Sequence, residues 1–151
     1  MKKFRYSMQS LLVIKQKLED QAKAAYGAAK LRLAEEEERL LMLQQKREAY
    51  VEEKRRVMST RLDVPKLNRL QTAVEAMDDQ IVRQRQNIKK AEAAVRVAEE
   101  RLVESMMERK TQERLKENAL EAYRQEMNAE EQKEIDERTS FRYGMNEAEE
   151  A

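Results

Sequence analysis

Apolar residues recur every three or four positions along most of this chain. In the first half the stripe runs through Phe4, Met8, Leu11, Lys15, Leu18, Ala22, Ala25, Ala29, Leu33, Glu36, Leu40, Leu43, Arg47, Tyr50, Lys54 and Val57. In the second half it runs through Leu67, Leu70, Val74, Met77, Ile81, Gln84, Ile88, Ala91, Val95, Ala98 and Leu102. Such steps are typical of coiled-coil helices, and neither half shows the period-two alternation of a strand. The pattern predicts two long helices.

The stripe changes phase in the first half. From Ala25 it proceeds by two successive steps of four, to Ala29 and Leu33. Two such steps form a stutter, which locally unwinds a supercoil. Gly27 lies beside this shift, and a glycine inside a helix costs about 1 kcal/mol relative to alanine. We therefore expect the first helix to be locally less stable near Gly27 but continuous.

The segment STRLDVPKLNRL, residues 59–70, contains the single proline of the chain. Proline is tolerated in the first turn of a helix and not in its interior, and Asp63 is a suitable N-cap for a helix that starts near Pro65. A connection this short favours an antiparallel helical hairpin in which residue i lies opposite roughly residue 125 − i.

The predicted fold is therefore all-α: a long two-helix antiparallel coiled coil with an overhanging C-terminal helix end. It forms one domain, residues 1–151, with helix 1 at about 3–61, a turn at about 62–64, helix 2 at about 65–138 and a flexible tail at 139–151. Beyond about Arg124 the second helix has no partner in the chain. Because helices without burial are marginal, segment 130–143 is expected to fray or to bind another molecule.

Composition limits the chemistry that the chain can perform. Charged residues make up 40% of it, aromatic residues only 5%, and both cysteine and histidine are absent. We find no phosphate-binding glycine loop and no nucleophile beside a base, so we expect no catalytic, cofactor-binding or metal-binding residue and no enzyme activity. The net charge of +1 gives no general attraction to nucleic acid.

The longest apolar run of the N-terminal region, residues 11–14, is too short for a signal peptide or a membrane span. We therefore expect a cytoplasmic protein, monomeric when isolated, without direct membrane insertion.

Two short motifs resemble a known family. F-x-Y-x-x-Q-x-L-L near the start and E-x-K-x-x-D-E near the end are carried by Phe4, Tyr6, Gln9, Leu11, Leu12, Glu131, Lys133, Asp136 and Glu137. Together with ERLLMLQQKREAY and RQNIKKAEAAVRVAEERLVESMMERKTQERLK, they resemble the FliJ family of flagellar type III export proteins. The resemblance covers nearly the whole chain in the right order.

This resemblance implies a function. FliJ-family proteins are antiparallel coiled coils similar to the two terminal helices of the γ subunit in rotary ATP synthases. The likeness implies a stalk that inserts into the hexameric export ATPase, promotes its assembly and activity, and contacts the membrane export gate and export chaperones. It also implies peripheral association with the cytoplasmic face of the flagellar basal body at the inner membrane. The alternatives are the equivalent stalk of a virulence type III secretion system, or a generic coiled-coil adaptor or prefoldin-like holdase.

Two sets of residues are candidates for partner binding. The run Leu40–Leu43 cannot be buried by one stripe, so either the core widens locally or a gate-side surface forms from Leu41, Met42 and Tyr50. An ATPase-side surface at the opposite end would comprise Lys2, Lys3, Arg5, Lys133, Asp136, Glu137 and Arg138. Cations at a helix start oppose the helix dipole, which favours a partner over a merely solvated helix start.

Overall fold

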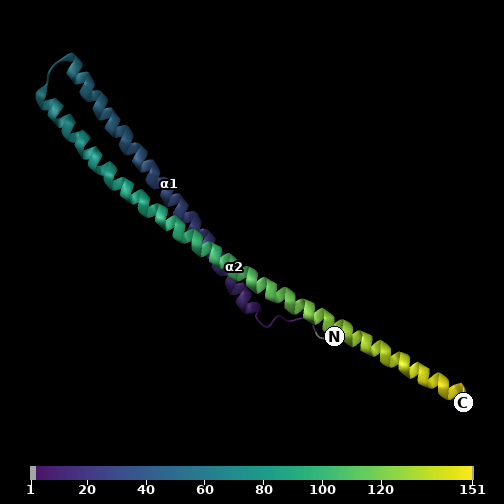
Figure 1. Ribbon diagram of the computed structural model, residues 1–151. Coiled ribbons are helices and arrows are strands. Elements are labelled where there is room, and N and C mark those ends of the chain that lie inside the picture. The colour runs from purple at the N-terminus through teal and green to yellow at the C-terminus, as the bar shows by residue number, and fades with distance from the viewer. Residues whose placement is uncertain (1–2, 151) are drawn as a thin grey trace. The chain divides into compact units, whose positions relative to one another are not determined.

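The computed structural model describes residues 3–150, most of which lie in two long helices, α1 (Gln9–Thr60) and α2 (Val64–Glu150) (Figure 1). The two helices pack against each other, and residues 3–150 contain no β-strand. Side-chain pairs such as Lys54 with Gln71 and Arg47 with Asp78 show that they run antiparallel. The predicted helical hairpin is confirmed.

The turn consists of residues 61–63, and Asp63 starts the second helix. Its carboxylate accepts a hydrogen bond from the Lys66 backbone N–H (3.2 Å), and its carbonyl accepts one from the Leu67 N–H (3.0 Å). Asp63 is thus the N-cap of α2. Pro65 is the second residue of that helix, where no intrahelical partner for its nitrogen is needed. The single proline is placed where it begins a helix and breaks none.

The helix ends lie elsewhere than the sequence suggested. Helix α1 begins at Gln9 rather than near residue 3, and the Gln9 N–H donates to the carbonyl of Tyr6 (3.1 Å). The preceding residues instead bring Phe4 and Tyr6 against α2. Helix α2 continues to Glu150 rather than ending near residue 138. Segment 139–150 contains no proline, and its one glycine costs about 1 kcal/mol, so no strong breaker stops the helix.

The chain comprises two compact units, and each contains a segment of α1 and a segment of α2. Unit 2, residues 19–104, holds the turn and most of the buried apolar residues, namely Val57, Val74, Met77, Ile81 and Ala91. Its cross-helix pairs are Lys54 with Gln71, Arg47 with Asp78 and Glu36 with Gln84. The two residue numbers in each pair add up to about 120–125, in agreement with the register expected for this hairpin.

Unit 1 consists of residues 1–18 with 105–151, of which 3–18 and 105–150 are described. The Phe4 and Tyr123 rings lie 5.5 Å apart at 50°, and the Tyr6 hydroxyl donates to the Gln112 amide oxygen (3.3 Å). Lys15 forms a 2.9 Å ion pair with Glu108. Unit 1 is thus also antiparallel, held by an aromatic pair, a hydrogen bond and an ion pair, and it buries Leu12.

The predicted stutter in α1 is wrong. The stripe was traced through Leu11, Leu18 and Ala25, but Leu18 is 41% exposed, whereas Leu12 and Glu19 are buried and Tyr26 is half-buried. Between Leu12 and Leu33, the positions of α1 that are at least partly buried are Leu12, Lys15, Glu19, Ala22, Tyr26, Ala29 and Leu33. These steps alternate between three and four without interruption, so no local unwinding is required. The error arose because the stripe was traced through the nearest apolar residues instead of through positions at a constant alternation of three and four.

Candidate partner-binding surfaces

The apolar run in α1 is divided between the core and the surface. Leu40 and Leu43 are half-buried, whereas Leu41 is 53% exposed and Met42 is 62% exposed. Met42 and Leu43 line a shallow hollow together with Arg39, Gln45, Lys46 and Gln84. The run therefore leaves two large apolar side chains open to solvent and does not simply widen the core.

Tyr50 lies on the opposite side of α1 from Leu41. It is half-buried, and it continues the stripe that contains Leu43. Because successive residues of an α-helix are about 100° apart, Tyr50 lies about 180° from Leu41 and about 80° from Met42. The structure therefore does not bring the three gate-side candidates together in one surface.

An exposed residue that the sequence interpretation missed, Val82 on α2, shares a flank with Leu41. Val82 is 59% exposed and borders a second hollow, whose lining is Gln44, Arg47, Glu48, Asp78, Ile81, Val82 and Arg85. Gln44 and Glu48 follow Leu41 by three and seven residues, which places them on the same face of α1. The signal was available, since Ile81 and Val82 are adjacent and one stripe can bury only one of them.

Charged residues frame this flank. The Arg47 guanidinium donates to the Asp78 carboxylate across the two helices of unit 2. This ion pair lies beside Ile81 and Val82 in the same hollow. Unit 2 therefore presents a small apolar flank, Leu41 and Val82, with an ion pair between its two helices. We call this the Leu41–Val82 flank.

The basic ATPase-side candidates lie before α1. Lys3 and Arg5 are exposed, and they alternate with Phe4 and Tyr6, whose side chains contact α2. Lys2 lies outside the described residues. The alternation explains the exposure of the cations, because an extended segment points successive side chains to opposite sides.

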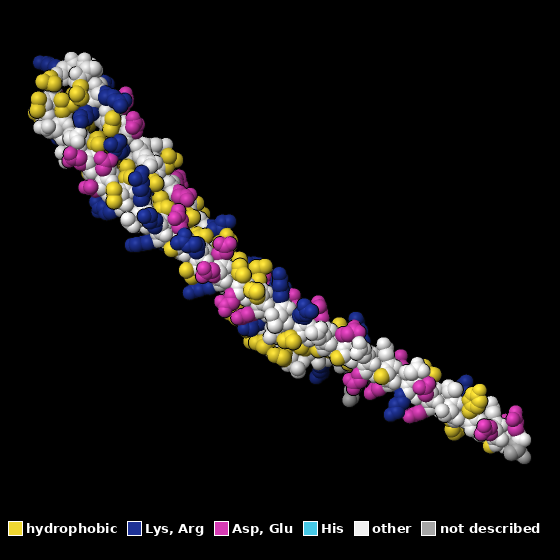
Figure 2. All heavy atoms as spheres, viewed as in Figure 1, with side chains coloured by type: hydrophobic (Ala, Val, Ile, Leu, Met, Phe, Trp, Pro, Cys, Tyr) yellow, Lys and Arg dark blue, Asp and Glu magenta, His cyan; other side chains and the backbone are white. Residues whose placement is uncertain are grey.

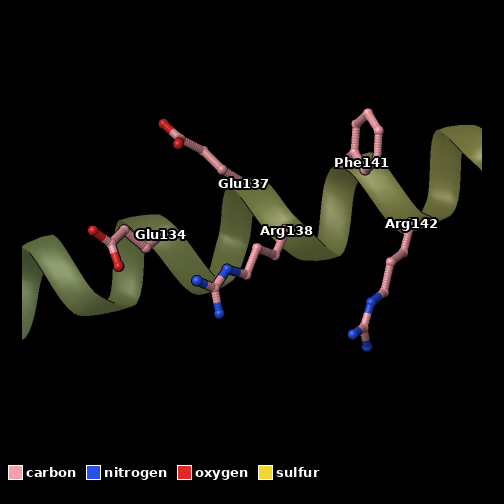
Figure 3. A pocket seen from close by; sticks show the side chains of 5 residues that line it. All are labelled: Glu134, Glu137, Arg138, Phe141 and Arg142. Carbon is pink, nitrogen blue, oxygen red and sulfur yellow. The ribbon is translucent and has the colours of Figure 1, made fainter.

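The remaining ATPase-side candidates, Lys133, Asp136, Glu137 and Arg138, are all exposed on α2. Every residue from 128 to 150 is exposed. Figure 3 shows the shallow hollow that Glu134, Glu137, Arg138, Phe141 and Arg142 line on this single helix, with Glu137 and Phe141 pointing to one side and the two arginines to the other. The side chains do not converge on an enclosed site, so this segment offers a surface and no pocket.

Large apolar residues on the same segment were also missed. Ile135, Phe141, Tyr143 and Met145 are 54%, 67%, 69% and 54% exposed, respectively. Phe141 and Met145 are four residues apart and so lie on one face. The C-terminal part of α2 therefore exposes large apolar side chains as well as charged ones.

The two ATPase-side groups are not brought into one cluster. Phe4 contacts Tyr123, which fixes Lys3 and Arg5 near that point of α2. Lys133 follows Tyr123 by ten residues, which is about 15 Å along a helix. A partner that touched both groups would have to cover a stretch of unit 1 rather than a point.

The described residues were also searched for metal-binding clusters, membrane-spanning stretches and ionisable groups with shifted pKa values. Among residues 3–150 we find no group of three or more Asp or Glu side chains placed to hold a metal ion. Neither described helix is apolar over a stretch long enough to cross a bilayer. The hydrogen bond from Arg56 lowers the pKa of Glu53 below its ordinary value, and Lys66 lowers it further. Glu53 and Arg56 lie at the surface and line no enclosed site.

Comparison with known proteins supports the helical fold and identifies the family. The sequence model of the family described as "Flagellar FliJ protein" matches residues 4–148. None of the curated proteins matches the chain significantly. Among solved structures, a putative YscO homolog, CT670, from Chlamydia trachomatis has a similar fold, with a TM-score of 0.53, 16% identity and 98% of each chain covered. Since the family match spans almost every residue, the chain belongs to the FliJ family of flagellar export proteins.

Proposed function

We propose that this protein is the coiled-coil stalk of the flagellar type III export apparatus, acting by binding and not by catalysis. In this role it inserts into the hexameric export ATPase, promotes the assembly and activity of that ring, and contacts the membrane export gate and export chaperones. It would work at the cytoplasmic face of the basal body. The family match over residues 4–148 is the observation that supports this proposal.

The C-terminal part of α2 is the surface that we assign to the ATPase. Residues 128–150 are exposed throughout and combine Lys133, Asp136, Glu137 and Arg138 with the exposed apolar side chains of Phe141 and Met145. Exposed apolar side chains on a charged helix can pack against the helices of a partner. Lys3 and Arg5 form a second, separate basic group of unit 1 that we also assign to the ATPase.

The Leu41–Val82 flank is the surface that we assign to the export gate or a chaperone. Exposed apolar side chains beside an ion pair match the composition of transient protein interfaces, where an apolar centre has a polar rim. Met42 provides a second, separate apolar position on the other side of α1, in the hollow with Leu43. A methionine suits a surface that must adapt to more than one partner.

A deletion of residues 131–151 tests the ATPase assignment. Because every described residue of this segment is exposed, the truncated protein should unfold at nearly the same temperature as the full chain. It should nevertheless lose most of its stimulation of ATP hydrolysis by the export ATPase and its promotion of ring assembly. The charge reversals Lys133→Glu and Arg138→Glu should weaken stimulation, and rising salt should weaken it further.

A matched control is the pair Arg83→Glu and Lys89→Glu, two exposed cations of unit 2, which should leave stimulation unchanged. Full stimulation by the truncated protein would remove the basis of the ATPase assignment. Equal losses from both charge-reversal pairs would show a general effect of charge.

A further inference from the structure

The near-zero net charge of the chain conceals a strongly basic segment around the hairpin turn. Residues 54–69 contain six cations, Lys54, Arg55, Arg56, Arg61, Lys66 and Arg69, against one acid, Asp63, whereas the net charge of the whole chain is +1. Asp63 is engaged as the N-cap of α2. We call residues 54–69 the turn segment.

Part of this charge is not neutralised within the protein. Arg55 pairs with Glu52 at 3.3 Å, and Glu53 is shared by Arg56 and Lys66. Arg61 and Arg69 are exposed and form no ion pair with any residue in the described part of the chain. Two cations therefore remain available to an external anion, one on either side of the Pro65 region.

The turn segment also exposes apolar side chains. Leu62 is 76% exposed, the highest fraction among the large hydrophobic residues described, and Met58 and Val64 are 60% and 52% exposed. Leu62 lies in the three-residue connection itself, Met58 lies in the last turn of α1, and Val64 is the first residue of α2. In Figure 2 hydrophobic and basic side chains gather where unit 2 ends at the turn.

These residues favour one class of partner. None of the three apolar residues lines either of the hollows of unit 2 described above, and all three are exposed. Exposed apolar side chains among cations fit a deformable surface that is negatively charged outside and apolar beneath, which describes a bilayer with anionic lipids. An acidic protein would need a matching apolar cavity for each of them.

We propose that the turn segment docks on the surface of an anionic membrane, with Leu62, Met58 and Val64 entering the interfacial layer and Arg61 and Arg69 contacting lipid phosphates. The contact is shallow and spans nothing. It rests on residues of unit 2 alone and is independent of the ATPase and gate assignments above, so either can fail without the other.

Vesicle binding tests the proposal. The full chain should sediment with vesicles of equal parts phosphatidylglycerol and phosphatidylcholine, and not with pure phosphatidylcholine. Arg61→Gln and Arg69→Gln should each weaken binding roughly fivefold, which corresponds to about 1 kcal/mol for one cation at an anionic surface. Met58→Ser with Leu62→Ser should weaken it at unchanged charge. The matched controls are Arg83→Gln with Lys89→Gln and Leu31→Ser with Val97→Ser, all at exposed positions of unit 2.

Insertion can be measured directly because the chain has no tryptophan. The emission of the Leu62→Trp variant should shift to shorter wavelength when anionic vesicles are added and should be quenched by brominated lipid, whereas that of Leu31→Trp should do neither. The proposal is overturned if binding does not depend on anionic lipid, if the control variants lose as much binding as the turn variants, or if the Leu62→Trp emission neither shifts nor is quenched. Tight binding to polyglutamate without binding to vesicles would overturn it in favour of an acidic protein.

Discussion

Gln84 donates its side-chain amide both to the backbone carbonyl of Glu36, at 2.8 Å, and to the Glu36 carboxylate. Both residues are 6% exposed and lie among the apolar positions of unit 2. Asn87 donates to the other end of the Gln84 amide (3.2 Å), and Arg39 lies 3.6 Å from the Glu36 carboxylate. The Glu36 carboxylate is thus held in the core by a hydrogen bond from Gln84 on α2 and by Arg39 on its own helix, α1.

Removing one partner of this pair should be worse than removing both. Gln84→Leu leaves the buried Glu36 carboxylate without its amide donor and should lower the free energy of unfolding by about 2–3 kcal/mol. The double variant Glu36→Leu, Gln84→Leu replaces both by apolar groups and should regain wild-type stability or exceed it. Urea unfolding followed by circular dichroism measures the wild-type protein and both variants. A double variant as unstable as Gln84→Leu would show that the polar pair is itself stabilising.

Gly27→Ala should stabilise the protein by about 1 kcal/mol, because alanine has the higher helix propensity. A Cβ atom at position 27 would meet no atom within 4 Å, and no φ is left-handed among the described residues. The uninterrupted phase of the stripe in α1 gives the glycine no role in a stutter. Thermal unfolding measures the gain, and a loss of stability would mean that the helix needs flexibility at this point.

The carboxyl group of Glu53 should titrate below its ordinary pKa, chiefly because Arg56 donates a hydrogen bond to it. A carboxyl whose pKa is lowered by folding adds stability above its unfolded pKa, and this contribution is lost as the pH falls through the folded value. The group is at the surface, so the effect on unfolding should be small. Carboxyl NMR titration measures the pKa, and Arg56→Gln should raise it toward the ordinary value. Arg55→Gln, which alters a residue that pairs with Glu52 instead, is the matched control.

Mutations in the Leu41–Val82 flank should affect binding, whereas mutation of Tyr50 should affect stability. Leu41→Ser with Val82→Ser removes two exposed side chains and should weaken gate or chaperone binding while changing the free energy of unfolding by less than about 0.5 kcal/mol each. Tyr50→Ala acts on a half-buried residue and should lower stability by about 1–3 kcal/mol. Binding assays paired with urea unfolding distinguish the two. Unchanged binding by the stable double variant would rule out this flank as the contact surface.

The sequence predicted the fold well because each signal for it is local. The proline, the Asp63 cap and the spacing of apolar residues each depend on a few neighbours, and together they determine two helices and a turn. The phase of the stripe near Glu19 depends on something else. Glu19 is buried and has a cation, Lys23, one turn away at 3.2 Å, so a charged residue occupies a position where the pattern favoured Leu18.

The candidate surfaces were predicted less completely. Exposure of Leu41 and Met42 followed from counting apolar residues in one short run, and the same argument applied to Ile81 and Val82 would have found the second half of the flank. Tyr50 is half-buried because it occupies a position of the stripe, which its residue type alone does not indicate. The positions of partner-binding residues also depend on the partner, and that information is not contained in the apolar pattern.

The uneven distribution of the core has a consequence for how the chain folds. Apart from Leu12, the buried apolar residues of the described chain all belong to unit 2, next to a turn that brings together residues close in sequence. Contacts of short sequence separation form with the least loss of chain entropy. Folding should therefore start at the turn, and the helix pairs should form in order from the turn toward the termini. On the reverse path, amide hydrogens of residues 9–18 should exchange with solvent well before those of residues 70–91. The terminal part of the pairing can then open and close while the rest remains folded.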